Sequence, residues 1–292
     1  MKLWYSNKLL LLSLVLLLFA SCIDEDNSNC VQYSVTPSAV DSTGKAIPAV
    51  VKGNLQAYLF INGKFDRIVT SEVDGSFKVS YDGKAGTASL VTIGKTSADS
   101  VNVHNPIEGE DIGNMAISVL IDPKSGGYTL PSSLYYGRYD YDSQQARSKP
   151  VDTTLVMVNK PIILRVVVKS LKETFGDYSD YSVVISGFRT TMTFSGEITG
   201  DPIEYTPEYV YNSSNQLVTD PIRALPTKKG DYVTVSVYRG NNSIWSTALD
   251  ENGNYVRLKS GEDKVLIVDC GRKTIFMTVK AWDQYTQEIV IP

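Results

Sequence analysis

The chain is a succession of short strand-like runs that end at turn residues, and this pattern restricts it to an all-β fold. Leu55–Phe60 leads into Asn62-Gly63, a strong signal for a two-residue β-hairpin, and the chain returns through Phe65–Thr70. Phe77–Tyr81 alternates between apolar and polar residues, as a half-buried strand does. A helical apolar period is found only near Leu171–Phe175. The sequence therefore predicts strands joined by tight turns, with very little helix.

The strand-like runs fall into two sets, which predicts two β-sandwich domains at residues 31–148 and 149–292. Each set contains about seven runs, the number that one sandwich of this kind needs. The polar, Tyr-rich stretch from Tyr135 to Pro150 separates the sets and is predicted to be a linker or long connection. Four prolines loosen the strand spacing between Gly196 and Lys229, so this region is predicted to be a long surface excursion.

Residues 1–21 have the pattern of a bacterial lipoprotein signal peptide. Two lysines precede an apolar run from Leu9 to Ala20, which is too short for a comfortable transmembrane helix. The segment closes on Phe19-Ala20-Ser21-Cys22, which matches the bacterial lipobox. Small residues there admit the peptidase, and the Cys22 thiol accepts the diacylglyceryl group. Cys22 is therefore predicted to carry lipid, and a triacylated cysteine anchors a protein stably because several acyl chains are buried.

Residues 22–30 form a predicted acidic tether. Asp24, Glu25 and Asp26 follow the lipid-bearing Cys22 almost directly. This cluster resembles the surface-export signal of Bacteroidales lipoproteins, which implies a surface-exposed protein anchored in the outer membrane. An anionic tether is also well solvated and does not fold back onto an anionic membrane.

Charge balance and residue types exclude several functions. The chain has 28 Lys and Arg against 32 Asp and Glu, so it lacks the basic surface that nucleic-acid binding needs. It has one His and no Cys-x-x-Cys, which leaves a metal site or thiol-redox chemistry without support. Gly-x-Ser-x-Gly, a Gly-rich phosphate loop and His-Glu-x-x-His are all absent. The sequence therefore predicts neither an enzyme nor a cofactor.

The segment from His104 to Asp111 combines the single histidine with a carboxylate cluster. Glu108, Glu110 and Asp111 have the chemistry of a Ca²⁺ site or a glycosidase, but their spacing is diagnostic of neither. We favour a solvated acidic loop, with His104 as ordinary polar surface.

Two hypotheses concern covalent chemistry beyond Cys22. Cys30 and Cys270 either form a disulfide, which an exported protein permits, or stay unpaired, with Cys270 packed at the end of a strand. Both alternatives stay open, because the sequence does not supply the separation of the two residues. Asp99-Ser100-Val101 resembles the O-glycosylation sequence of exported Bacteroidales proteins, which makes Ser100 a candidate modification site.

Two segments are candidates for contacts with other molecules. Tyr135–Tyr141 either covers the seam between the two domains, which we favour, or stacks on a glycan or a protein, and Trp245 is a second candidate stacking residue. At the C-terminus, Thr286–Ile291 is rich in strand-forming residues. It is predicted to be an edge strand of the second sandwich or a strand donated to a neighbouring subunit, with Thr286, Ile289, Val290 and Ile291 as its main residues.

Several separate motifs together resemble the fimbrial anchor and fimbrillin lipoproteins of Bacteroidales, the FimB-type family. The motifs are spread over most of the mature chain, and the lipobox is the sharpest of them. They comprise Cys22 with Cys30-Val31-Gln32-Tyr33, Tyr58-Leu59-Phe60 with Asn62-Gly63-Lys64-Phe65, Ser133–Gly137, Ile162–Lys169 with Tyr181–Gly187, Tyr205-Thr206-Pro207, and Trp282.

This resemblance implies two transthyretin-like Greek-key sandwiches in a fimbrial subunit that joins fimbrillin partners by β-strand complementation. Shaft subunits of such systems lose their lipidated N-terminus by cleavage after an Arg. Here the first Arg after Cys22 is Arg67, and cleavage there would destroy the hairpin at Asn62-Gly63. We therefore expect the lipid to be retained, which favours an anchor or basal subunit. The alternative is a surface glycan-binding lipoprotein.

Overall fold

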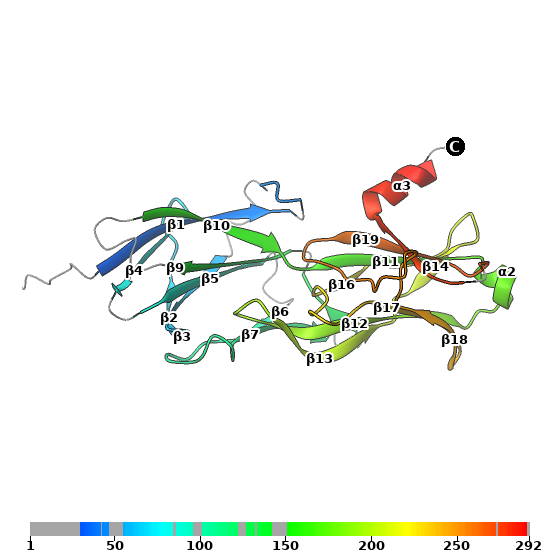
Figure 1. Ribbon diagram of the computed structural model, residues 1–292, viewed down its shortest axis with the longest axis horizontal. Coiled ribbons are helices and arrows are strands. Elements are labelled where there is room, and N and C mark those ends of the chain that lie inside the picture. Colours follow the sequence, from blue (N-terminus) through cyan, green and yellow to red (C-terminus); the bar gives the residue numbers. More distant parts are fainter. Residues whose placement is uncertain are drawn as a thin grey trace, which may run out of the picture.

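The computed structural model describes residues 30–41, 43–46, 55–83, 86–95, 101–121, 127–131, 133–141, 151–272 and 274–290. These residues form an elongated, almost entirely β-stranded molecule whose strands lie in two layers along most of its length (Figure 1). The all-β prediction is confirmed. None of the described helices is long and apolar enough to cross a membrane.

Three sheets make up the described part of the chain. The first sheet has the strand order β3 (Lys64–Val69), β2 (Leu55–Ile61), β5 (Ala88–Lys95), β9 (Leu134–Tyr141), β10 (Val151–Asn159), β1 (Cys30–Val40) and β4 (Phe77–Asp82). The second has the order β14 (Tyr209–Tyr211), β15 (Leu217–Thr219), β11 (Ile162–Lys169), β19 (Asp263–Asp269) and β20 (Met277–Ala281), with β16 (Ile222–Ala224) also on β11. The third has the order β18 (Asn242–Thr247), β17 (Thr234–Arg239), β12 (Tyr181–Thr193), β7 (Ala116–Ile121) and β6 (Val101–Val103), with β13 (Ile198–Tyr205) on β12 and β8 (Tyr128–Thr129) on β7. Two helices are described, α2 (Leu171–Phe175) and α3 (Trp282–Val290).

The first sheet folds over on itself to enclose a core. Its two layers, β4-β1-β10 and β3-β2-β5-β9, are joined where β9 and β10 pair through Val158↔Tyr136 and Asn159↔Tyr135. Buried side chains from all seven strands meet between the layers, among them Val31, Leu59 and Phe77. On the opposite side, β3 and β4 are the outermost strands of the sheet.

The hairpin between β2 and β3 forms as predicted. Asn62 and Gly63 have φ angles of 52° and 74°, the left-handed values that a type I′ turn requires at both central residues. Asn tolerates this conformation and Gly has no Cβ to oppose it. Arg67 lies inside β3, as the sequence also predicted.

One continuous hydrophobic core joins the first sandwich to the second. Phe194, just after β12, packs its ring against Tyr58 and Phe60 of β2, at centroid distances of 5.0 and 6.3 Å. The strands β6 and β7 follow β5 in the chain but belong to the third sheet, where Ser118 pairs with Thr191. A large shared apolar core restricts relative motion of the two halves. The two halves therefore pack against each other through buried apolar side chains.

Sheet membership does not follow the predicted boundary at residues 148/149, which lies outside the described residues. β10 comes after that boundary and pairs within the first sheet, whereas β6, β7 and β8 come before it and pair in the third. The division of the chain into two domains at this point stays a prediction.

Two predicted connections are strands instead. Tyr135–Tyr141 of the predicted linker belong to β9 (Leu134–Tyr141), the central strand of the first sheet, and residues 142–150 are not described. The predicted excursion between Gly196 and Lys229 contains β13, β14, β15 and β16. Pro202 fits within β13 because this strand pairs only with β12 and the register shifts beside it. Proline was therefore a poor marker of a loop in this region.

The predicted C-terminal edge strand is wrong, because residues 282–290 form helix α3 and Ile291 lies outside the described residues. Thr286, Ile289 and Val290 are therefore helical. Trp282 and Tyr285 are three residues apart, so a helix brings both to one face. That face covers Val167, Val265 and Ile267 on the outer surface of the second sheet. Packing there overrides the strand preference of the local sequence.

Candidate attachment site

The N-terminal strand β1 is built into the interior of the first sheet. It begins at one end of the elongated molecule (Figure 1). It pairs in parallel with β10, from Tyr33↔Val151 to Val40↔Val158, and antiparallel with β4 through Cys30↔Asp82 to Val35↔Phe77. Alternate side chains of β1 point into the core and are buried. The segment that carries Cys22 therefore enters the fold through a strand held on both sides.

A cluster of tyrosine rings fixes β1 to its neighbours in the core. The Tyr33 ring lies 4.1 Å from that of Tyr141 on β9, and Tyr81 of β4 is 6.3 Å from Tyr141. Burial among these rings raises the pKa of Tyr141. The cluster stabilises β1 through aromatic packing as well as through the strand ladder.

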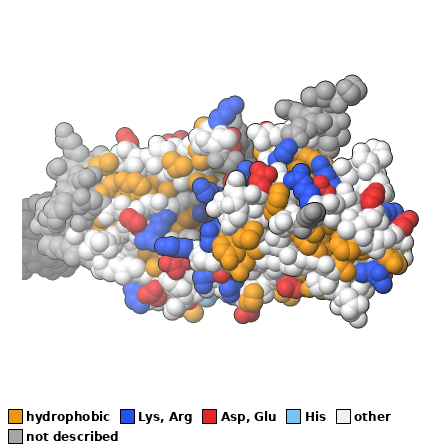
Figure 2. Space-filling view, turned by 45° about the vertical axis from the view of Figure 1, so that its right-hand side comes forward, with side chains coloured by type: hydrophobic (Ala, Val, Ile, Leu, Met, Phe, Trp, Pro, Cys, Tyr) orange, Lys and Arg blue, Asp and Glu red, His pale blue; other side chains and the backbone are white. Residues whose placement is uncertain are grey.

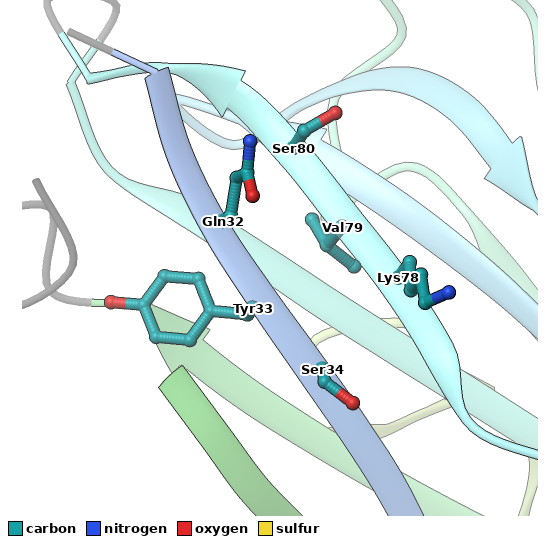
Figure 3. Close-up of a pocket in the computed structure, with 6 residues that line it drawn as sticks. All are labelled: Gln32, Tyr33, Ser34, Lys78, Val79 and Ser80. Carbon is teal, nitrogen blue, oxygen red and sulfur yellow. The ribbon is translucent and has the colours of Figure 1, made fainter. Parts of the chain in front are cut away.

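A surface depression of about 300 Å³ lies over the β1–β4 pair (Figure 3). Gln32 and Ser34 of β1 border it, with Lys78 and Ser80 of β4, whereas the Tyr33 ring turns to the other side of the sheet (Figure 3). Amide, hydroxyl and ammonium groups border the depression, and most of its exposed lining is apolar. These groups suit polar contacts with an extended chain and include no nucleophile paired with a base.

The free edge of β4 lies beside this depression. The Ser76 carbonyl accepts a hydrogen bond from the Glu72 amide at 2.7 Å, and the Ser80 carbonyl accepts one from the Arg67 guanidinium at 2.5 Å. Both carbonyls therefore point away from β1. Because the direction alternates along a strand, the backbone groups of Lys78 face the same way. The start of this edge is covered by the chain that follows β3, through an antiparallel bridge between Ser71 and Phe77, and the Arg67 guanidinium covers it at Ser80.

The opposite edge of the sandwich is covered by the loop between β6 and β7. The Phe65 amide of β3 donates to the Glu110 carbonyl at 2.7 Å, and the Ile112 amide donates to the Gly63 carbonyl at 2.8 Å. Lys64 forms an ion pair with Asp111 at 3.2 Å. The first half of β3 thus has partners on both sides, and β4 is the more accessible of the two edges.

The acidic segment 104–111 is part of this covering loop, and its carboxylates bind other groups of the loop and of β3. Glu110 lies 2.9 Å from His104 Nε2 and accepts from the Ile107 amide at 3.2 Å. The hydrogen bond from His104, followed by that from Ile107, lowers the pKa of Glu110. Hydrogen bonds from the Gly113 amide and Lys64 lower the pKa of Asp111. Each carboxylate thus has its own protein partners, and among the described residues no group of acidic, His and Cys side chains is arranged to hold a metal ion.

Two predicted modification sites, Cys22 and Ser100, lie outside the described residues. The candidate disulfide is wrong, because Cys30 and Cys270 are both free thiols. Cys30 starts β1 at one end of the molecule, whereas Cys270 follows β19 near the other (Figure 1). Cys270 is buried in the core, and this burial raises the pKa of its thiol to about 12. The structure thus matches the alternative in which Cys270 packs at a strand end.

The aromatic candidates are part of the fold rather than exposed platforms. Tyr135, Tyr136 and Tyr141 are buried in β9, and Trp245 is half-buried against the core. The Tyr136 hydroxyl donates to the Phe194 carbonyl at 2.9 Å, so this residue covers the seam as we favoured. Tyr232 and Tyr255 form an exposed pair that the sequence does not signal, because the two rings stack on each other although they lie far apart in the chain.

Comparison with known proteins identifies the family. A family model described as the fimbrillin-A associated anchor proteins Mfa1 and Mfa2 matches residues 27–288. The chain belongs to this family. A comparison with curated proteins gives no match. Membership in the Mfa family confirms the resemblance seen in the sequence and associates the protein with fimbriae at the cell surface.

Solved structures show the same fold at low sequence identity. The fimbrial anchor protein Mfa2 of Porphyromonas gingivalis is 16% identical, with 86% of this chain and 97% of that chain covered and a TM-score of 0.62. A candidate adhesin of Bacteroides ovatus is 14% identical, with 87% and 94% covered and a TM-score of 0.61. A candidate polysaccharide-binding protein of Bacteroides thetaiotaomicron is 12% identical, with 86% and 98% covered and a TM-score of 0.60.

Proposed function

We propose that this Mfa-family protein is a fimbrial anchor or basal subunit, held in the outer membrane by lipid on Cys22 and bound to fimbrillin subunits. The observation that carries the proposal is the position of β1 between β10 and β4. The predicted tether runs directly into this strand. Any pull on the lipid is therefore delivered to a strand of the first sheet that is paired on both sides.

The direction of β1 suits an anchor under tension. The strand lies along the long axis of the molecule, starting at its N-terminal end (Figure 1). A pull along this axis loads the β1–β10 and β1–β4 ladders in shear, so many hydrogen bonds must break together. The continuous core around Phe194 then passes the force to the second half. The eight residues from Cys22 to Asn29 reach at most about 28 Å, which keeps the first sandwich near the membrane.

Retention of the N-terminus is supported by the place of Arg67. Cleavage after Arg67 would remove β1, β2 and most of β3 together, and with them much of the buried core of the first sandwich. A shaft subunit that loses its N-terminus in this way would be left without a stable first half. A subunit that keeps its lipidated strand is an anchor.

The free edge of β4 is the proposed point of β-strand complementation. An extended segment of a fimbrillin subunit would pair with the outward-facing backbone groups of Ser80, and its side chains would lie over the neighbouring depression. The covered edge of β3 offers no comparable row of groups along its first half. A strand added at β4 does not require β1 to leave the first sheet.

The test compares Cys22→Ala with the matched variant Cys30→Ala in cells that make fimbriae. We expect Cys22→Ala to lose labelling by palmitate and to release fimbriae into the medium, because the tether no longer holds lipid. Cys30→Ala should behave as the wild type, since this thiol forms no disulfide. Palmitate labelling that persists in Cys22→Ala, or fimbriae that stay on those cells, would refute the anchor.

A further inference from the structure

Two exposed tyrosines form a stacked pair on the second half of the molecule. The rings of Tyr232 and Tyr255 lie 4.3 Å apart with an interplanar angle of 22°. They are 38% and 51% exposed. A stacked aromatic pair at the surface offers an apolar face with hydroxyl groups at its rim, a combination that suits a ligand with both apolar and polar groups.

The backbone holds this pair in place. The Val233 amide donates to the Val256 carbonyl at 2.8 Å, and the Val256 amide donates to the Ala248 carbonyl at 3.0 Å. Val233 and Val256 are buried, which turns the preceding tyrosine of each outward. Gly187, at a bulge of β12, allows close approach, because a Cβ there would lie 2.0 Å from the Tyr232 carbonyl oxygen. Binding at the pair therefore costs little conformational entropy.

Polar groups surround the rings. Arg257 lies two residues beyond Tyr255 on the same exposed side of the chain, because Val256 and Leu258 are buried between and after them. Its Nε donates to the Asp231 carbonyl at 3.2 Å, and the Asp231 carboxylate is paired with Arg189 at 2.8 Å. Neither tyrosine hydroxyl has a protein hydrogen-bond partner within the described residues. The hydroxyls and the outer guanidinium nitrogens of Arg257 are thus available.

We propose that Tyr232, Tyr255 and Arg257 form a carbohydrate-binding platform for a neutral pyranose of a surface glycan. The outer aromatic face packs against the C–H face of a sugar ring, while the hydroxyls and the guanidinium hydrogen-bond its hydroxyl groups. Because the Asp231 carboxylate is paired with Arg189, it does not compete with the sugar for the Arg257 guanidinium. This function is additional to anchoring.

The size of the patch favours a sugar over a protein. A stable protein interface buries about 800 Å² on each partner around an apolar centre. Here Leu249 is the exposed large apolar residue that pairs with Tyr255, and charged residues surround the group. On the face shown in Figure 2, acidic and basic side chains are interspersed among separate hydrophobic areas. A site of two rings and one guanidinium matches one or two sugar residues.

The experiment screens the purified mature protein against an array of neutral hexose and N-acetylhexosamine oligosaccharides, and measures the best ligand by calorimetry. Tyr255→Ala should weaken that binding by about tenfold, the equivalent of about 1.4 kcal/mol. Tyr178→Ala is the matched control, because Tyr178 is also exposed, at 42%, but stacks on Arg239 elsewhere. It should leave binding unchanged.

Two further measurements decide the outcome if a variant is unstable. Thermal unfolding reports whether Tyr255→Ala is folded, and Tyr255→Phe, which removes only the hydroxyl, should weaken binding less than Tyr255→Ala. A wild-type protein that binds no array glycan overturns the platform, as does equal binding by wild type and a Tyr232→Ala/Tyr255→Ala double variant. Binding of purified fimbrillin that is lost in the double variant, with no glycan bound, would also overturn it and assign the pair to a protein contact.

Discussion

The hydroxyl of Tyr136 donates a 2.9 Å hydrogen bond to the carbonyl oxygen of Phe194, and this bond crosses between the first sheet and the strand layers of the second half. Both groups are buried, so each depends on the other for a partner. Lys160 lies over the same tyrosine ring, 4.8 Å from its centroid, and burial lowers the pKa of Lys160. The seam is thus closed by polar as well as apolar contacts.

We expect Tyr136→Phe to lower the free energy of unfolding by about 1–2 kcal/mol, because the Phe194 carbonyl is left buried without its donor. Urea unfolding of the purified mature protein measures the change. Tyr139→Phe is the control, since the Tyr139 ring is half-buried and its hydroxyl makes no hydrogen bond with the described residues. Equal stability of wild type and Tyr136→Phe would show that the bond contributes nothing.

The same residue predicts a pH dependence. Burial raises the pKa of Tyr136 to about 12, whereas a tyrosine in the unfolded chain titrates near 10. A raised folded pKa favours the protonated form in the fold, so the stability it contributes is complete below pH ~10 and is lost as the pH rises toward 12. Wild type should therefore lose more stability than Tyr136→Phe between these values. If wild type and Tyr136→Phe lose the same free energy of unfolding between pH 9 and pH 11, this prediction is contradicted.

Local signals in the sequence predicted the elements that depend on local chemistry. The Asn62-Gly63 hairpin formed because the turn type is fixed by those two residues. The strand in Leu134–Tyr141 was missed because tyrosines and charges look solvated until their neighbours in space are known. Whether Cys30 and Cys270 pair depends on the distance between segments that are remote in the chain, and so does the stacking of Tyr232 on Tyr255. Periodicity carries no information about such distances.

The thiols give a direct chemical prediction. Cys270 is buried and the pKa of its thiol is raised to about 12, so it should resist alkylation in the native protein. Cys30 is partly exposed and should react. Iodoacetamide labelling followed by peptide mass mapping should find Cys30 modified before denaturation and both residues afterwards. Finding the two cysteines in one disulfide-linked peptide pair would contradict the structure.

Helix α3 is expected to stabilise the second sheet rather than serve another molecule. Tyr285 is buried over Val265 and Ile267, and Trp282 lies 4.1 Å from the Arg165 guanidinium. Tyr285→Ala should therefore lower the free energy of unfolding by about 3 kcal/mol, through lost burial and an unfilled space. Gln284→Ala is the control, because the neighbouring Gln284 is exposed. Equal melting temperatures for wild type and Tyr285→Ala would show that the helix is not packed there.

The free edge of β4 is tested by Ser80→Pro. The Ser80 carbonyl and, with it, the Ser80 amide face away from β1, so proline removes an edge donor while the β1–β4 ladder keeps its hydrogen bonds. We expect the variant to melt within a few degrees of wild type and to bind immobilised fimbrillin subunits at least tenfold more weakly. Val79→Pro is the contrasting variant, because its amide faces β1 and its loss should destabilise the first sandwich. If Ser80→Pro is folded and binds fimbrillin as tightly as wild type, strand addition does not occur at this edge, and the subunits must attach at another surface of the anchor.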